Sequence, residues 1–133
     1  MKNIYLLLAI LCLSTTVIAQ SKKGDRFFKR GDYIGAAHHY EQALKDNNSK
    51  ENLSKVIDAY YLGQDYKSAA LYLNQLVNER FNDQDRTFDN EFNFKMYHAL
   101  TVTGEGVEAL NYLEAYYKNK GEDFDKTKAL ETV

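Results

Sequence analysis

The sequence contains no proline, one cysteine and only seven glycines among its 133 residues. Because proline interrupts helices, its complete absence favours a chain of uninterrupted helices. The single cysteine, Cys12, lies inside an apolar N-terminal run. If that run is removed, the remaining chain has no disulfide, thiol nucleophile or zinc–thiolate site. We therefore expect no metal and no cofactor.

The first nineteen residues have the layout of a secretory signal. Lys2 supplies a positive start, Ile4–Leu13 is apolar, and small side chains precede a cleavage point after Ala19. The apolar run is too short to span a bilayer comfortably. An uncleaved anchor is the alternative, and lipidation of Cys12 is disfavoured because Leu11 stands where a small residue is needed. The sequence predicts an exported protein, periplasmic or associated with the outer membrane.

The charge of the chain after cleavage is mildly acidic, with sixteen Lys and Arg against nineteen Asp and Glu. Both signs are mixed along the sequence. No basic block indicates a nucleic-acid partner, and no polybasic stretch indicates an anionic lipid surface. Beyond the signal there is no candidate membrane span.

Apolar residues recur every three or four positions from residue 21 onward, as one buried face of each helix requires. No alternating strand pattern of useful length is present. The predicted helices are Ser21–Gly31, Tyr33–Asp46, Lys50–Leu62, Tyr66–Glu79, Phe92–Thr103, Val107–Asn119 and a short helix after Asp123.

Several helix boundaries carry chemical signals. Asp32 and Asp65 each precede a helix, where a carboxylate can accept the free amide protons of the first turn. Asn48, with an acidic residue three positions later, fits a capping box. Gly31 and Gly121 stand where chains leave helices through left-handed backbone angles.

An internal repeat is the strongest feature of the sequence. Two aromatics, three residues and then Asp-Tyr-x-x-Ala-Ala occur in 27–37 and again in 60–70, at an offset of 33. A looser third copy spans 99–109, with about seven extra residues before it in the polar stretch 80–90. A period near ~34 residues with helix–turn–helix content is typical of a helical solenoid.

The repeat places a small residue early in the second helix of each pair, at Ala36, Ala69 and Ala109. We expect these alanines to let paired helices approach closely. The larger residues that should fill the space beyond are Tyr40, Leu73 and Leu113, followed by Ala43, Leu76 and Tyr116. Since one pair is too small to bury its own apolar face, stacking on the next pair should close the core.

This spacing resembles the tetratricopeptide repeat family over about residues 21–120. The signature positions of the first pair hold Gly24, Phe27, Gly31, Tyr33, Ala36, Tyr40 and Ala43. The second pair keeps Tyr60, Tyr66 and Ala69 but has Ile57 where glycine is usual; the third keeps Gly104 and Ala109, with Gly106 in place of the turn tyrosine. The resemblance implies three antiparallel helix pairs and a short C-terminal helix, forming one right-handed stack over residues 20–133.

A narrower resemblance is carried by the export signal together with 92–100 and 108–113. These segments look like the N-terminal repeat region of Bacteroidetes OmpA-family cell-envelope proteins, several of which belong to gliding or type IX secretion machinery. The propeller-like and peptidoglycan-binding regions of that family do not follow here. A fragment, a short stand-alone relative and a piece of a larger assembly all stay open.

In tetratricopeptide repeats the first helix of each pair lines a concave groove that holds the partner. The residues that the resemblance places there are Asp25, Phe28 and Lys29, then Asp58, Tyr61 and Leu62, then Phe94, His98 and Thr101. Aromatic side chains would supply contact area, and carboxylates would select basic or amide groups. The alternative is that the aromatics only pack between neighbouring helices.

No motif indicates catalysis. His38 and His39 are adjacent, point to different sides of a helix and should be solvated; His98 has no metal-ligating neighbour at helical spacing, which favours a structural role or a groove contact. The acidic stretch 82–89 lacks the glycine of a calcium loop. We expect no enzymatic activity and no small-molecule substrate.

These features predict a non-catalytic scaffold or adaptor of the bacterial cell envelope, which binds a peptide or protein partner such as a component of an envelope complex. One alternative is a self-associating structural subunit of a secretion or gliding complex. Another is a small peptidoglycan- or carbohydrate-binding module that uses the eleven tyrosines and seven phenylalanines. The oligomeric state stays open.

Overall fold

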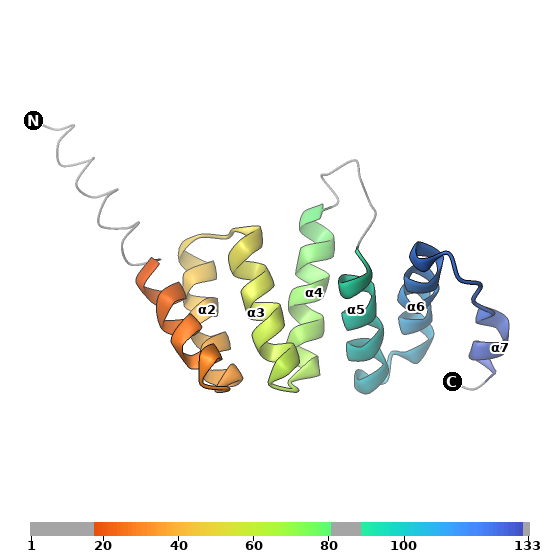
Figure 1. The fold of residues 1–133 in the computed structure, drawn as a ribbon, viewed down its shortest axis with the longest axis horizontal. Helices are drawn as coiled ribbons and strands as arrows, with labels where there is room; N and C mark the ends of the chain where they lie inside the picture. The colour runs from red at the N-terminus through yellow and green to blue at the C-terminus, as the bar shows by residue number, and fades with distance from the viewer. Residues whose placement is uncertain (1–17, 81–88, 132–133) are drawn as a thin grey trace, which may run out of the picture. The chain divides into compact units, whose positions relative to one another are not determined.

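The computed structural model describes residues 18–80 and 89–131, and every regular element within these ranges is an α-helix. These residues fall into two compact units, the first ending at Gly63 and the second beginning at Gln64. Within each unit, helices that follow one another in sequence pack together (Figure 1). The predicted all-α class with sequentially packed helices is confirmed.

The first unit contains a helix over residues 18–29, then α2 (Tyr33–Asp46) and α3 (Lys50–Leu62). Both ends of α2 and of α3 fall where the sequence predicts them. The first helix is already present at residue 18, three residues before the predicted start, and ends at residue 29.

Side-chain caps fix the starts of α2 and α3. Asp32 Oδ1 accepts a 2.9 Å hydrogen bond from the Gly35 amide, as predicted. The capping box at Asn48 is wrong: Ser49 is the N-cap of α3, and its hydroxyl accepts from the Asn52 amide at 3.2 Å. The reason is positional, because α3 begins at Lys50 and Asn48 therefore lies one residue too early to reach the first-turn amides.

Small residues let the 18–29 helix lie close against α2. A Cβ atom on Gly24 would lie only 2.5 Å from Cε1 of Tyr40, so the absence of a side chain at Gly24 makes room for that ring. Ala36 and Ala43 are fully buried on α2. Asn52 is a buried polar residue of α3, and its amide nitrogen donates to the carbonyl oxygens of Ala43 and Asn47, which ties α3 to the end of α2.

The second unit contains α4 (Tyr66–Arg80), α5 (Asn90–Thr103), α6 (Gly106–Lys120) and α7 (Lys126–Leu130). The boundary between the units thus falls between α3 and α4, which the sequence assigns to one pair. Helix α4 ends one residue later than predicted, α6 extends one residue beyond its predicted range at each end, and α5 begins two residues early.

Caps again explain these boundaries. Asp65 Oδ1 accepts from the Ser68 amide at 3.1 Å, as predicted. Asp89 Oδ1 accepts from the Phe92 amide at 2.8 Å, and this cap starts α5 ahead of the first apolar residue of its pattern. Gly104 and Gly121 end α5 and α6 with φ angles of 92° and 72°, in the left-handed region that favours glycine.

The core of the second unit follows the repeat at its start and weakens toward its end. Ala69 and Ala109 are fully buried, and Leu73 is 1% exposed. Leu113 and Tyr116, the equivalents in the third pair, are only half-buried. The five-residue helix α7 has no buried residue of its own, so it covers little of α6.

Some predictions lie outside the described residues, namely most of the signal, Cys12 and the stretch 81–88. In the part of the chain that the structure describes, no helix combines the length and the apolar character that crossing a membrane requires.

Candidate functional site

Asp25, one of the predicted partner-binding residues, lies at the centre of a polar network in the first unit. Its Oδ1 atom accepts hydrogen bonds from the Tyr40 hydroxyl at 2.8 Å and from Lys55 Nζ at 3.2 Å. Lys55 also donates to the Ser21 hydroxyl at 3.0 Å and lies 3.7 Å from a carboxylate oxygen of Glu51. The network joins the 18–29 helix to α2 and α3.

The network sets the ionisation of its members. Burial by itself would raise the pKa of Asp25, but the hydrogen bonds from Tyr40 and Lys55 and the charges of Lys55 and Lys29 outweigh it and lower that pKa. Burial, followed by the hydrogen bond to Asp25 and the charges of Asp25 and Asp58, raises the pKa of Tyr40. At neutral pH the network therefore holds an ionised Asp25 that accepts from a protonated Tyr40.

The other predicted residues of the first unit differ in how accessible they are. Phe28 is half-buried, with its ring centroid 5.1 Å from that of Tyr33 and 6.5 Å from that of Tyr40, so part of its surface packs against α2 and part stays accessible. Lys29 is exposed. Asp58 and Tyr61 are half-buried, and Leu62 is exposed at the end of α3.

The second unit carries a group of aromatic rings around α5, which we name the α5 aromatic cluster. It comprises Tyr66, Phe94, Tyr97, His98 and Tyr116. Phe94 lies at its centre, with ring centroids 6.4 Å from Tyr97, 6.4 Å from His98 and 5.8 Å from Tyr116. Phe94 is nevertheless 46% exposed, and the other four members are half-buried.

Three helices build this cluster. Phe94 and His98 are four residues apart and therefore share one face of α5. Tyr66, at the start of α4, contributes an edge-on contact to His98 at 4.7 Å, and Tyr116 reaches the cluster from α6. Thr101, the third residue predicted on this face, is exposed, and its hydroxyl donates to the carbonyl oxygen of Tyr97.

Ring contacts continue from the cluster to the C-terminal part of the unit. Tyr116 packs edge-on against Tyr117 at 5.5 Å, and Tyr117 stacks on Phe124 at 5.3 Å. The Lys120 ammonium lies 5.3 Å from the Tyr116 ring centroid and pairs with Glu122 at 3.0 Å. The half-exposed rings are thus bordered by charged side chains on this side.

The histidines and acidic residues do not form a metal site within the described ranges, where no group of three or more ligand residues is suitably placed. His38 is exposed, as predicted. The prediction that His39 is solvated is wrong, because its ring packs 4.9 Å from that of Phe27 and is half-buried. Burial, with the charges of Lys23 and His38, lowers the pKa of His39.

Sequence reasoning placed Phe94 and His98 on one face of α5, and the structure brings them into contact. It did not identify Tyr40 and Lys55 as the partners of Asp25. Nor did it identify Tyr66 as a neighbour of His98 or Tyr116 as a neighbour of Phe94. Those contacts join residues 15 to 32 positions apart, and helical spacing within one element carries no signal for them.

Comparison with known proteins finds no matching family model and no similar curated protein. The likeness to tetratricopeptide repeats therefore depends on the repeat residues themselves and on the sequential packing of the helices.

Proposed function

We propose that this chain is an exported, non-catalytic protein-interaction module of the tetratricopeptide type, acting as a scaffold or adaptor in the bacterial cell envelope. It binds a peptide or protein segment through residues on the first helices of its pairs. The contact residues that we propose are Asp25, Phe28, Lys29, Asp58, Tyr61, Phe94 and His98.

The observation that carries this proposal is the exposure of Phe94 within the α5 aromatic cluster. A phenylalanine that is 46% exposed while three rings pack against it offers apolar area on a fixed support. Because its neighbours already hold the ring, binding would cost little side-chain entropy. Burying a fully exposed side chain of this kind stabilises by about 1.5–3 kcal/mol, and binding would gain the share that belongs to the still exposed part of Phe94.

The first unit would contribute charge rather than apolar area. Asp25 is ionised, and its side chain is 42% exposed despite its bonds to Tyr40 and Lys55. Lys29, one turn later on the same helix, is exposed. A polar peptide backbone or a side chain of either sign could pair with these groups, beside the half-buried ring of Phe28.

The test compares two alanine variants of the same helix. Affinity capture from envelope extracts supplies the bound protein, and titration calorimetry then measures its dissociation constant for each variant. Phe94→Ala should weaken binding by about tenfold or more, which corresponds to about 1.4 kcal/mol. Val102→Ala is the matched control, because Val102 is 55% exposed on α5 and takes no part in the cluster.

Circular dichroism would first establish that both variants keep their helical content. If the Phe94→Ala variant then binds the captured protein as tightly as the unaltered chain, the proposed surface is wrong. Specific binding of an oligosaccharide in the absence of any captured protein would instead support the carbohydrate-binding alternative.

A further inference from the structure

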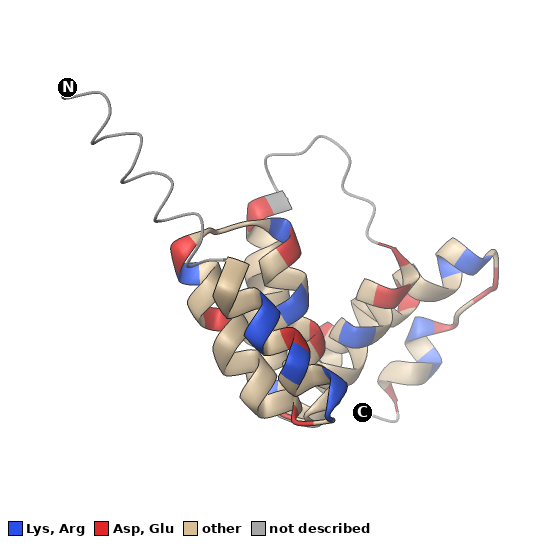
Figure 2. Ribbon diagram, turned by 60° about the vertical axis from the view of Figure 1, so that its left-hand side comes forward, with Lys and Arg blue, Asp and Glu red and all other residues tan. Residues whose placement is uncertain are grey.

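The exposed face of the 18–29 helix is almost purely basic. At 100° per residue, Lys22, Lys23, Arg26 and Lys29 fall within an arc of about 120°, and Arg30 follows in the adjoining turn. All five side chains are exposed. Figure 2 shows the blue segments following one another along this helix, which begins where the grey N-terminal trace ends.

These cations outnumber their local counter-charges, although the charge of Lys29 acts on Asp25. The only acidic residue of the helix is Asp25, and its carboxylate is engaged by Tyr40 and by Lys55 of α3. Within the described residues, neither Lys22 nor Arg26 forms an ion pair with any carboxylate. Lysines and arginines that alternate with acidic residues along the sequence therefore gather on one face of this helix in the fold. This explains why the sequence alone indicated no basic surface.

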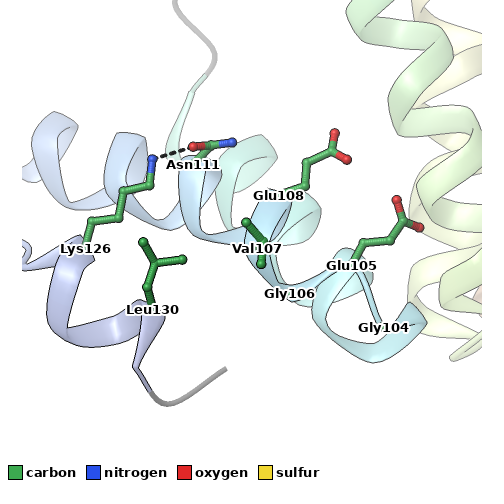
Figure 3. Close-up of a pocket in the computed structure, with 8 residues that line it drawn as sticks. All are labelled: Gly104, Glu105, Gly106, Val107, Glu108, Asn111, Lys126 and Leu130. Carbon is green, nitrogen blue, oxygen red and sulfur yellow. Dashed lines mark hydrogen bonds between the residues drawn. The ribbon is translucent and has the colours of Figure 1, made fainter.

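The second unit carries a surface of the opposite sign. A shallow depression of about 700 Å³ lies between the start of α6 and helix α7. Val107 and Leu130 face one another across it in Figure 3, and both are strongly exposed, at 65% and 43%. Exposed apolar side chains of this kind can be covered by the aliphatic stems of lysine or arginine.

Two carboxylates give the depression its charge. Glu105 and Glu108 are exposed residues that line the depression on the α6 side, where their carboxylates point away from α7 in Figure 3, and neither forms an ion pair within the described residues. The one lysine of the depression, Lys126, is already occupied, because it donates to Asn111 and to Glu114. Lys126 is therefore not available to pair with Glu105 or Glu108, and the nearest other lysine lining a hollow with Glu105 is Lys67 of α4, which forms no ion pair with it within the described residues.

We propose that the basic face of the 18–29 helix of one copy docks on the acidic depression of a second copy, so that the chain associates head to tail. Lys22 and Arg26 pair with Glu105 and Glu108, and their aliphatic stems cover Val107 and Leu130. The contact joins two different surfaces and is therefore heterologous. The ion pairs use neither Phe94 nor Asp25, and Lys29 is the one residue of the basic face that also belongs to the binding surface proposed above.

The association is expected to be weak and strongly dependent on salt, because exposed ion pairs are screened by mobile ions. Sedimentation velocity of the purified full chain at about 0.01 M and about 1 M salt compares Debye lengths of about 30 Å and about 3 Å. At low salt the mean mass should rise with protein concentration, and at high salt it should stay that of the monomer.

Neutral variants identify the two surfaces. Lys22→Gln/Arg26→Gln removes charge from the basic face, and Glu105→Gln/Glu108→Gln removes it from the depression; each should raise the dissociation constant at least about tenfold. Lys45→Gln/Lys50→Gln is the matched control, because both lysines are exposed in the same unit outside the basic face, and it should associate normally.

An equal mixture of the two neutral variants gives the decisive result. Each variant keeps one intact surface, so the mixture should form heterodimers and nothing larger. A mixture that stays monomeric, or one that grows beyond dimers, overturns the proposal. So does an unaltered chain that remains monomeric at low salt, or association that the matched control weakens as much as the basic-face variant.

Discussion

The hydroxyl of Tyr40 donates a 2.8 Å hydrogen bond to the carboxylate of Asp25, a residue fifteen positions earlier on the preceding helix. Tyr40 is 3% exposed, and its ring also lies against the position where a Cβ of Gly24 would stand. Lys55 reaches the same carboxylate from α3. This one phenol therefore aligns the first helix pair and orients a carboxylate of the proposed binding surface.

Tyr40→Phe should destabilise the first unit while leaving its shape intact. The substitution removes only the hydroxyl, so the cost is one hydrogen bond to a charged acceptor, about 1–2 kcal/mol once the partial exposure of Asp25 is taken into account. Denaturant unfolding followed by circular dichroism measures the change. Tyr33→Phe is the matched control and should cost less, because Tyr33 is only half-buried.

The same network predicts a dependence of stability on acid pH. Because the pKa of Asp25 is lowered in the folded state, its carboxylate stabilises the fold above the ordinary value of 3.8. That contribution is lost as the pH falls from there through the lower folded pKa. The difference in unfolding free energy between the unaltered chain and Asp25→Asn should therefore shrink as the pH falls below this range.

Unfolding by denaturant at a series of pH values measures that difference. Asp123→Asn, at an exposed position after α6, serves as the control and should show a smaller change with pH. A constant offset between Asp25→Asn and the unaltered chain across the whole series would contradict the network.

Gly24→Ala tests the close approach of the 18–29 helix to α2. Alanine favours a helix by about 1 kcal/mol over glycine, so at an open position this change would stabilise. Here the new methyl group would lie 2.5 Å from the Tyr40 ring, which is held by packing and by Asp25. Overpacking of this kind costs about 1–3 kcal/mol, and we expect a lower thermal midpoint.

The control is Lys23→Ala, on the exposed side of the same helix, which should leave the thermal midpoint unchanged. A rise in the thermal midpoint of Gly24→Ala would show that the Tyr40 ring moves aside.

The elements of this fold were more predictable than its contacts. Both ends of α2 and α3 follow from helical periodicity and from capping and turn residues such as Asp32 and Gly31. These residues lie within a few positions of the helix boundary that they set. The N-cap of α3 is Ser49 and not Asn48. The two positions differ by one residue, and a periodic pattern does not locate the start of a helix that precisely.

The candidate surfaces depended on longer-range information. The sequence could place Phe94 and His98 on one face of α5, but not show that Tyr116 would pack against Phe94 from α6. In the sequence, charges of both signs lie close together around Asp25. In the fold, the Asp25 carboxylate points toward Lys55, while Lys22 and Arg26 lie on the outer side of the helix. Side-chain direction across helices decided these outcomes.

Phe124→Ala should release α7 without unfolding the second unit. Helix α7 has five residues and none of them is buried, so it is too short to be stable alone. Two attachments hold it to α6: the Phe124 ring stacks on Tyr117 at 5.3 Å with an interplanar angle of 3°, and Lys126 bonds to Asn111 and Glu114. Removing the ring leaves only the exposed polar attachment, which is weak in water.

Hydrogen exchange read out by mass spectrometry distinguishes local from global opening. Peptides covering 126–130 should exchange much faster in Phe124→Ala, while those containing Met96 and Leu100 should keep their protection, because both side chains lie in the buried core. Thr127→Ala, at an exposed position of α7, is the control and should change the exchange of α7 far less. Equal protection of 126–130 with and without the Phe124 ring would mean that the stack on Tyr117 does not hold α7 in place.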